Sequence, residues 1–83
     1  MTIQIESAER KGTGYYFTAT ANKVSALVCI YSHGFQIICK NASHRVWRGS
    51  GRHFHTLNDA LDHYRSPEMR AIINEAVNLS KAA

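Results

Sequence analysis

The side chains best suited to chemistry are concentrated between Lys40 and His55. These sixteen positions hold four basic residues, three histidines and one tryptophan, and they contain no Asp or Glu. Basic side chains neutralise phosphates, and aromatic rings stack on bases or sugars. The segment therefore predicts a contact with nucleic acid, most readily DNA, made by Lys40, Arg45, Trp47, Arg48 and Arg52.

The charge of the whole chain supports the same interpretation. The 83 residues carry a formal net charge of +4. From Arg10 to Asn58 there are seven basic residues and no acid, whereas the remainder has three basic and six acidic residues. Binding by phosphate neutralisation predicts an affinity that falls steeply with salt. The alternative is a solvated basic surface with no ligand.

Histidines and cysteines raise two further kinds of chemistry. His53 and His55 lie two positions apart beside Arg52, and in an extended segment both would point to one side, as acid-base cleavage of RNA requires. Neither C-x-x-C nor H-x-x-x-H occurs in the chain, so we expect no metal and no cofactor. We predict a non-enzymatic binding protein without catalytic residues, and a histidine-dependent ribonuclease is a distant alternative.

Strands must position these residues, because alternating apolar and polar residues dominate the first half of the chain. Two-residue turns are predicted at Asn22-Lys23 and at His33-Gly34. The expected strands cover residues 3–6, 15–21, 25–32, 35–40 and 44–48, with a flexible basic loop at 10–14. Together they predict an antiparallel meander of four or five strands, at about 2–48.

Two helices are predicted in the second half, at about 57–80. Thr56 and Asp59 match a capping box, and Ser66 followed by Pro67 is typical of a second helix start. Apolar residues follow each start at helical spacing. We expect a single α+β domain over residues 1–83, with both C-terminal helices packed on one face of the sheet.

The predicted turns also assign the two faces of the sheet. One face is apolar and is expected to form the core: Tyr15, Phe17, Ala19, Val28, Ile30, Phe35, Ile37 and Cys39. The other has an apolar centre flanked by tyrosines: Leu27, Cys29 and Ile38 between Tyr16 and Tyr31. The centre predicts a dimer or partner contact unless a helix covers it, and the tyrosines are assigned to the nucleic-acid site. Since the two cysteines fall on opposite faces, both are expected to be free thiols.

One stretch resembles a known DNA-binding family. Arg45-Val46-Trp47, followed by Phe54 to Tyr64 (FHTLNDALDHY), resembles the last strand and helix start of the ethylene-response-factor and phage-integrase-arm type of domain. In that family three antiparallel strands lie in the major groove, braced by one helix. The loop at 49–53 and the second helix are additions to that pattern. The resemblance implies a reading face with Tyr16, Thr18, Tyr31, Gln36 and Lys40, edged by Arg45 and Arg48.

A different class of function remains open. The chain has no apolar run long enough to span a bilayer and no signal-peptide pattern at Met1 to Arg10, so we expect a cytoplasmic protein without membrane contact. The alternative to nucleic-acid binding is a protein-interaction module, such as a phage or plasmid accessory protein. It would act as a homodimer or bind a host enzyme through the apolar second face.

Overall fold

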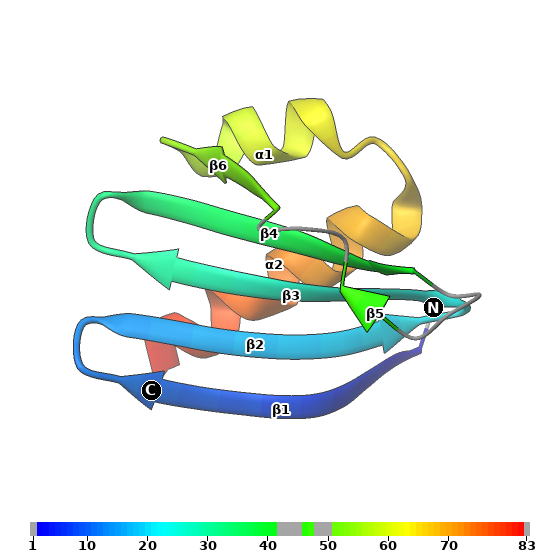
Figure 1. Ribbon diagram of the computed structural model, residues 1–83, viewed down its shortest axis with the longest axis horizontal. Helices are drawn as coiled ribbons and strands as arrows, with labels where there is room; N and C mark the ends of the chain where they lie inside the picture. Colours follow the sequence, from blue (N-terminus) through cyan, green and yellow to red (C-terminus); the bar gives the residue numbers. More distant parts are fainter. Residues whose placement is uncertain (1, 42–45, 48–50, 83) are drawn as a thin grey trace.

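Four long strands form a sheet in consecutive antiparallel hairpins. The computed structural model describes residues 2–41, 46–47 and 51–82. The hairpin strands are β1 (Ile3–Lys11), β2 (Gly14–Ala21), β3 (Val24–Tyr31) and β4 (Gly34–Asn41). Two short strands, β5 (Val46–Trp47) and β6 (Arg52–Phe54), both pair with β4, and two helices follow, α1 (Leu57–His63) and α2 (Pro67–Ala82) (Figure 1). The predicted α+β class, with an antiparallel sheet followed by two C-terminal helices, is confirmed.

The turns differ in how well they were predicted. The turn at Asn22-Lys23 is confirmed, with Asn22 in the left-handed region at φ 55°. The next turn lies at Ser32-His33, one position earlier than predicted, and Gly34 is the first residue of β4. The pairing of β3 with β4 is therefore shifted by two residues. Because side chains alternate with period two, this shift leaves every predicted face unchanged.

Strand β1 is longer than expected. Residues 10–14 were predicted to form a loop, but β1 runs to Lys11 and turns at Gly12-Thr13. A bulge between Ile5 and Ser7 shifts its register against β2. This strand lies at the edge of the sheet and is exposed along most of its length, so its sequence lacks the apolar alternation that marks half-buried strands. A bulge and charged residues are typical means of protecting such an edge from pairing with another chain.

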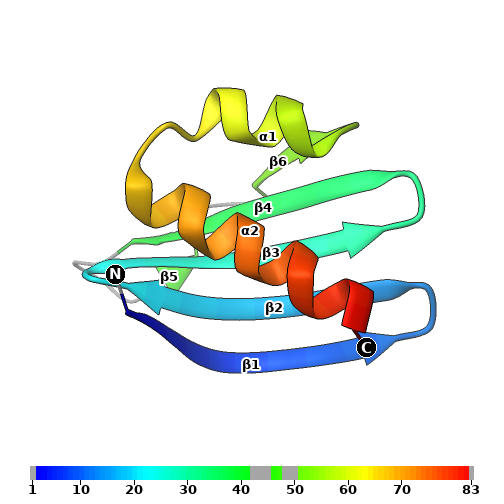
Figure 2. The same cartoon turned by 180° about the vertical axis from the view of Figure 1, so that it is seen from behind.

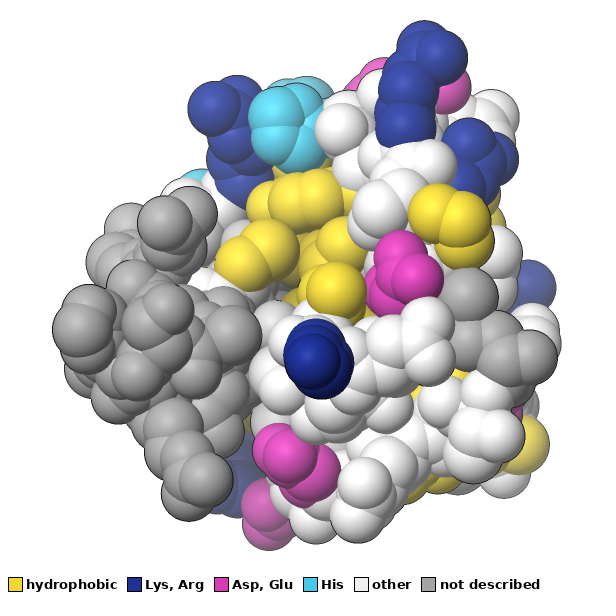
Figure 3. Space-filling model, turned by 90° about the vertical axis from the view of Figure 1, so that its right-hand side faces the viewer, with side chains coloured by type: hydrophobic (Ala, Val, Ile, Leu, Met, Phe, Trp, Pro, Cys, Tyr) yellow, Lys and Arg dark blue, Asp and Glu magenta, His cyan; other side chains and the backbone are white. Residues whose placement is uncertain are grey.

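The core lies between the sheet and the helices. Helix α2 crosses β1, β2 and β3 on one face, and α1 lies beside β4 and β6 (Figure 2). Fully buried side chains from both layers meet there, the largest being Phe17, Val28, Ile37, Ile72 and Ile73. At the end of the sheet seen in Figure 3, hydrophobic side chains remain visible, in agreement with the half-buried Ile3 and Val24 at that end. Both helices pack on the predicted face.

Both helix starts match the sequence signals. The Thr56 hydroxyl accepts a hydrogen bond from the Asp59 backbone N–H at 3.1 Å, and the Ser66 hydroxyl accepts one from the Met69 N–H at 3.2 Å. These bonds satisfy backbone donors that the first turn of a helix leaves without partners. In the described part of the chain, neither helix has the length and apolar character required to cross a membrane.

Strand β6 was not predicted. Residues 49–53 were interpreted as an inserted loop, but Arg52–Phe54 pair with Phe35, Gln36 and Ile37 of β4. A three-residue strand with two exposed polar side chains has no recognisable hydrophobic period, which explains the error. Gly34 enables this pairing: its φ is +152°, and a Cβ there would lie 2.5 Å from the Phe54 carbonyl oxygen.

Candidate nucleic-acid interface

The face of the sheet opposite the helices has no described helix over it, and we call it the open face. Figure 1 views the molecule from this side, with α2 behind the strands. Its side chains from β2, β3 and β4 are Tyr16, Thr18, Thr20, Ser25, Leu27, Cys29, Tyr31, Gln36 and Ile38. The predicted apolar residues and both tyrosines therefore share this face, but the two tyrosines lie together at one end of it and do not flank the apolar residues.

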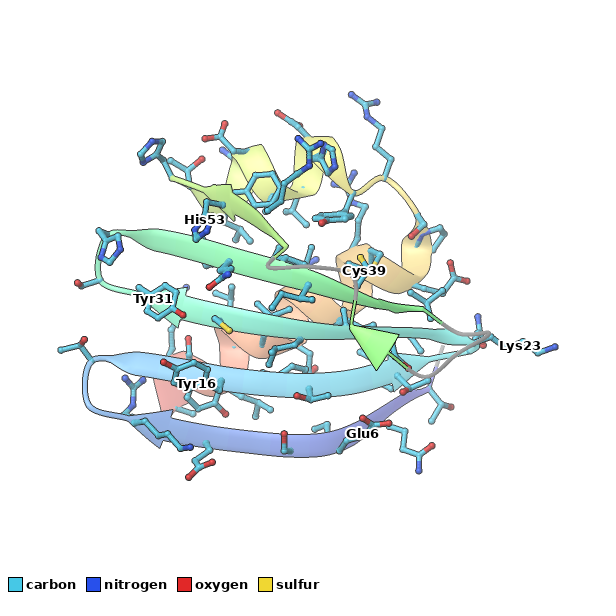
Figure 4. All side chains as sticks on the ribbon, in the orientation of Figure 1. Glu6, Tyr16, Lys23, Tyr31, Cys39 and His53 are labelled. Atoms are coloured by element: carbon cyan, nitrogen blue, oxygen red, sulfur yellow. The ribbon has the colours of Figure 1, made fainter. Side chains whose placement is uncertain are left out.

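A network formed by Tyr16 and Tyr31 lies at one end of the open face (Figure 4), where Tyr31 shares a hydrogen bond with the Cys29 thiol. The Tyr16 and Tyr31 rings meet edge to face with centroids 6.2 Å apart, and the Tyr31 hydroxyl donates to Gln36 Oε1 at 3.3 Å. Tyr16 and Gln36 are the direct cross-strand neighbours of Cys29. These neighbours leave only 3% of Cys29 exposed.

Cys29 and Tyr31 have raised pKa values and stay uncharged near neutral pH. Burial raises the pKa of the Cys29 thiol, and a hydrogen bond with Tyr31 offsets part of that rise. Desolvation, followed by hydrogen bonding with Tyr16 and the nearby Cys29 thiol, raises the pKa of Tyr31 to about 12. Cys29 and Tyr31 therefore add no thiolate or phenolate that would repel a phosphate.

The predicted partner centre is only partly accessible. Leu27 and Ile38 are paired directly across β3 and β4, and both are half-buried. The backbone at Gly51 comes so close that a Cβ there would clash with the Ile38 side chain. Since Cys29 is buried, a ligand on this face can touch Leu27 and Ile38 but has little access to the thiol. Cys29 and Cys39 are free thiols on opposite faces, as predicted.

Carboxylates lie along the β1 side of the open face. The Thr20 hydroxyl donates to Glu6 Oε1 at 3.1 Å and lies 2.7 Å from the Ser25 hydroxyl. Glu9 is paired with Tyr16 across β1 and β2, and its carboxylate lies 3.8 Å from the Lys11 ammonium. Strand β1 thus carries two carboxylates and two basic residues, Arg10 and Lys11, and has no formal net charge.

The basic segment joins the sheet at the β4 edge. Lys40 pairs with Trp47 across β4 and β5, which fixes the backbone of both residues there. Strand β5 lies in front of β3 in Figure 1 and behind it in the reverse view of Figure 2, so it lies on the side of the open face. Arg45 and Arg48 lie outside the described residues.

Arg52 is separated from the tyrosines to which sequence analysis assigned it. It lies opposite the core residue Ile37, so its side chain is on the helix side of the sheet. There the half-buried Tyr64 has its pKa raised to about 12 by desolvation and by the nearby Cys39 thiol, and Arg52 lowers it in part. The structure brings Tyr16 and Tyr31 together, but it does not bring Arg52 to them.

A pocket lies at the turn between β3 and β4, and it was not predicted from the sequence. We call it the histidine pocket, and its volume is about 100 Å³. It is lined by Tyr31, His33, Gly34, Phe35, His53, Phe54 and His55. The His33 ring is stacked on Tyr31, with centroids 5.6 Å apart and an interplanar angle of 12°.

The pairing of β6 with β4 brings His33 beside His53 and His55. In the sequence, the only sign of this close approach between strands was Gly34, the glycine that follows His33. Across the described residues, no three His, Cys, Asp or Glu side chains form a group able to hold a metal ion. The pocket therefore offers rings and imidazole nitrogens, and the ribonuclease alternative stays a prediction.

No protein-family model, curated protein or solved structure matches this chain.

Proposed function

We propose that this protein is a non-enzymatic DNA-binding protein that holds its ligand across the open face, with phosphates neutralised by the basic segment. The observation that carries the proposal is the pairing of Lys40 with Trp47. This pairing joins the basic segment, residues 40–55, to the edge of the sheet. The segment is rich in Arg and His and contains no carboxylate, and the adjoining open face presents two tyrosines. The resemblance of the segment to a DNA-binding domain supports the same class of ligand.

The distribution of charge supports this orientation. Strand β1 carries Glu6 and Glu9 together with Arg10 and Lys11 and has no formal net charge, whereas residues 40–55 contain four basic residues and no acid. A phosphate chain is therefore attracted more strongly by the basic segment than by β1. On the open face, Tyr16 and Tyr31 offer ring surfaces for stacking, and the raised pKa of Tyr31 keeps its hydroxyl uncharged.

The test is binding of labelled 20-nucleotide DNA, single-stranded and duplex, measured by fluorescence anisotropy across a salt series. We expect binding that weakens with salt. Each neutralised phosphate contributes about 0.7 to the logarithmic salt slope for a single strand and about 0.9 for a duplex. Arg45→Ala combined with Arg48→Ala should therefore weaken binding and reduce the slope for a single strand by about 1.4.

A charge-matched control separates a specific surface from general attraction. Arg65→Ala combined with Arg70→Ala removes the same charge from exposed positions around the start of α2. We expect this variant to bind nearly as well as the wild type. Equal losses in both double variants, or no binding at low salt, would contradict the proposal.

The half-buried apolar pair on the open face favours a second candidate, a protein-interaction module that acts as a homodimer or binds a host protein. Leu27 and Ile38 form a directly opposed apolar pair that no described helix covers. Light scattering tests the homodimer: the wild type should have twice the monomer mass, and Leu27→Asp should have the monomer mass. Asn78→Asp, an exposed change on α2, should leave the dimer intact. A monomeric wild type at high concentration rules out the homodimer.

A further inference from the structure

We infer that the histidine pocket receives one unpaired pyrimidine base, so that the ligand bound across the open face is single-stranded. This inference rests on the proposed function and specifies it. The pocket shares Tyr31 with the open face, and a strand that crosses the tyrosines passes directly beside it. A base paired within a duplex could reach the pocket only after being flipped out of its stack.

The size of the pocket favours a single ring. Its volume of about 100 Å³ is smaller than an engineered cavity of about 150 Å³ that holds benzene. A six-membered ring can enter an open pocket of this size, with its sugar outside. The larger bicyclic ring of a purine would have to leave much of its surface outside the pocket.

The lining matches the surfaces of a pyrimidine. The parallel Tyr31 and His33 rings provide a stacking wall, and the lining also includes Phe35 and Phe54. The imidazoles of His53 and His55 can each supply both a hydrogen-bond donor and an acceptor when neutral. Pyrimidine edges carry carbonyl acceptors and N–H donors, so stacking and edge recognition can occur together.

The pocket is formed before any ligand arrives. Phe54 is held from its other side by ring contacts with His63 and Tyr64, at centroid distances of 5.6 and 5.8 Å. The close approach of Gly34 to the Phe54 carbonyl fixes β6 against β4. A preformed site binds without the cost of ordering its own side chains.

The experiment compares oligo-thymidylate with oligo-deoxyadenylate of twelve nucleotides, using the full chain at low salt. We expect the wild type to bind oligo-thymidylate roughly tenfold more tightly, about the contribution of one stacked base. Pyrimidine runs can also be favoured through their flexibility alone, so the variants decide. His33→Ala should lower the affinity for oligo-thymidylate to the level of oligo-deoxyadenylate, and Asn74→Ala, at an exposed position of α2 outside the pocket, should keep the preference.

Circular dichroism establishes that each variant is folded, and His55→Ala, at an exposed position of the pocket, provides a second test if His33→Ala is not folded. Equal binding of both oligonucleotides by the wild type, or an unchanged preference in the pocket variants, overturns the inference while DNA binding stands. Absence of binding to both oligonucleotides and to duplex DNA at low salt overturns the proposed function, and the inference with it.

Discussion

Replacing Gly34 with alanine should separate β6 from β4 and destabilise the fold. Gly34 has a φ of +152°, and an added Cβ would lie 2.5 Å from the Phe54 carbonyl oxygen. A non-glycine residue in this backbone region costs about 1–3 kcal/mol. The clash adds to this cost, because the atom it meets is backbone and cannot move without displacing β6. We expect a total loss of about 2–4 kcal/mol in the free energy of unfolding.

Thermal unfolding followed by circular dichroism measures this loss. In a domain of 60–100 residues, 1 kcal/mol corresponds to about 4–8 °C in Tm, so Gly34→Ala should lower Tm by about 8–32 °C. Gly12→Ala is the matched control: Gly12 has a φ of +59°, but nothing lies within 4 Å of a Cβ there. It should lose only about 1–2 kcal/mol through its backbone conformation.

The comparison of the two alanine variants shows whether β6 lies close to β4 in solution. If Gly34→Ala loses no more stability than Gly12→Ala, the close approach of β6 to β4 is not present in solution. The histidine pocket would then lose its structural basis, because the pairing of these strands brings its histidines together.

Three further predictions concern other parts of the fold. Thr56→Ala should cost about 1 kcal/mol in urea unfolding, because the Asp59 N–H loses its capping acceptor. Arg10→Ala should cost about 1 kcal/mol in the same assay, because the guanidinium donates to a carbonyl near the end of α2 at 2.9 Å. Tyr31 and Tyr64 have pKa values raised to about 12 in the folded state, above the usual 10, so their stabilising contribution is complete below pH 10 and disappears as pH rises through 12. The urea midpoint should therefore be lower at pH 11.5 than at pH 9, and an unchanged midpoint would contradict the burial of these hydroxyls.

The central strands were predictable because they are half-buried. Apolar side chains alternate along β2, β3 and β4, and this alternation determines their faces even where the turn was misplaced. The helices were predictable because Thr56 and Ser66 provide local start signals that need no tertiary information.

The elements that were missed depend on contacts between distant parts of the chain. Strand β6 has three residues and no hydrophobic period, and only its pairing with β4 reveals it. That pairing also determines the side of each β6 residue. It places Arg52 with the helices and His53 in the pocket, an alternation that could not be assigned while these residues were interpreted as a loop. The sequence could indicate a basic, aromatic binding segment, but not which of its side chains share a face.

The most direct measurement of DNA binding across the open face is an NMR titration of the ¹⁵N-labelled protein with a single-stranded oligonucleotide. We predict shifts of the backbone amides of β3 and β4 and of the His33 and His53 side chains, and unchanged amides on the exposed side of α2. Shifts centred on α2, or no shifts at low salt, would contradict binding at the open face.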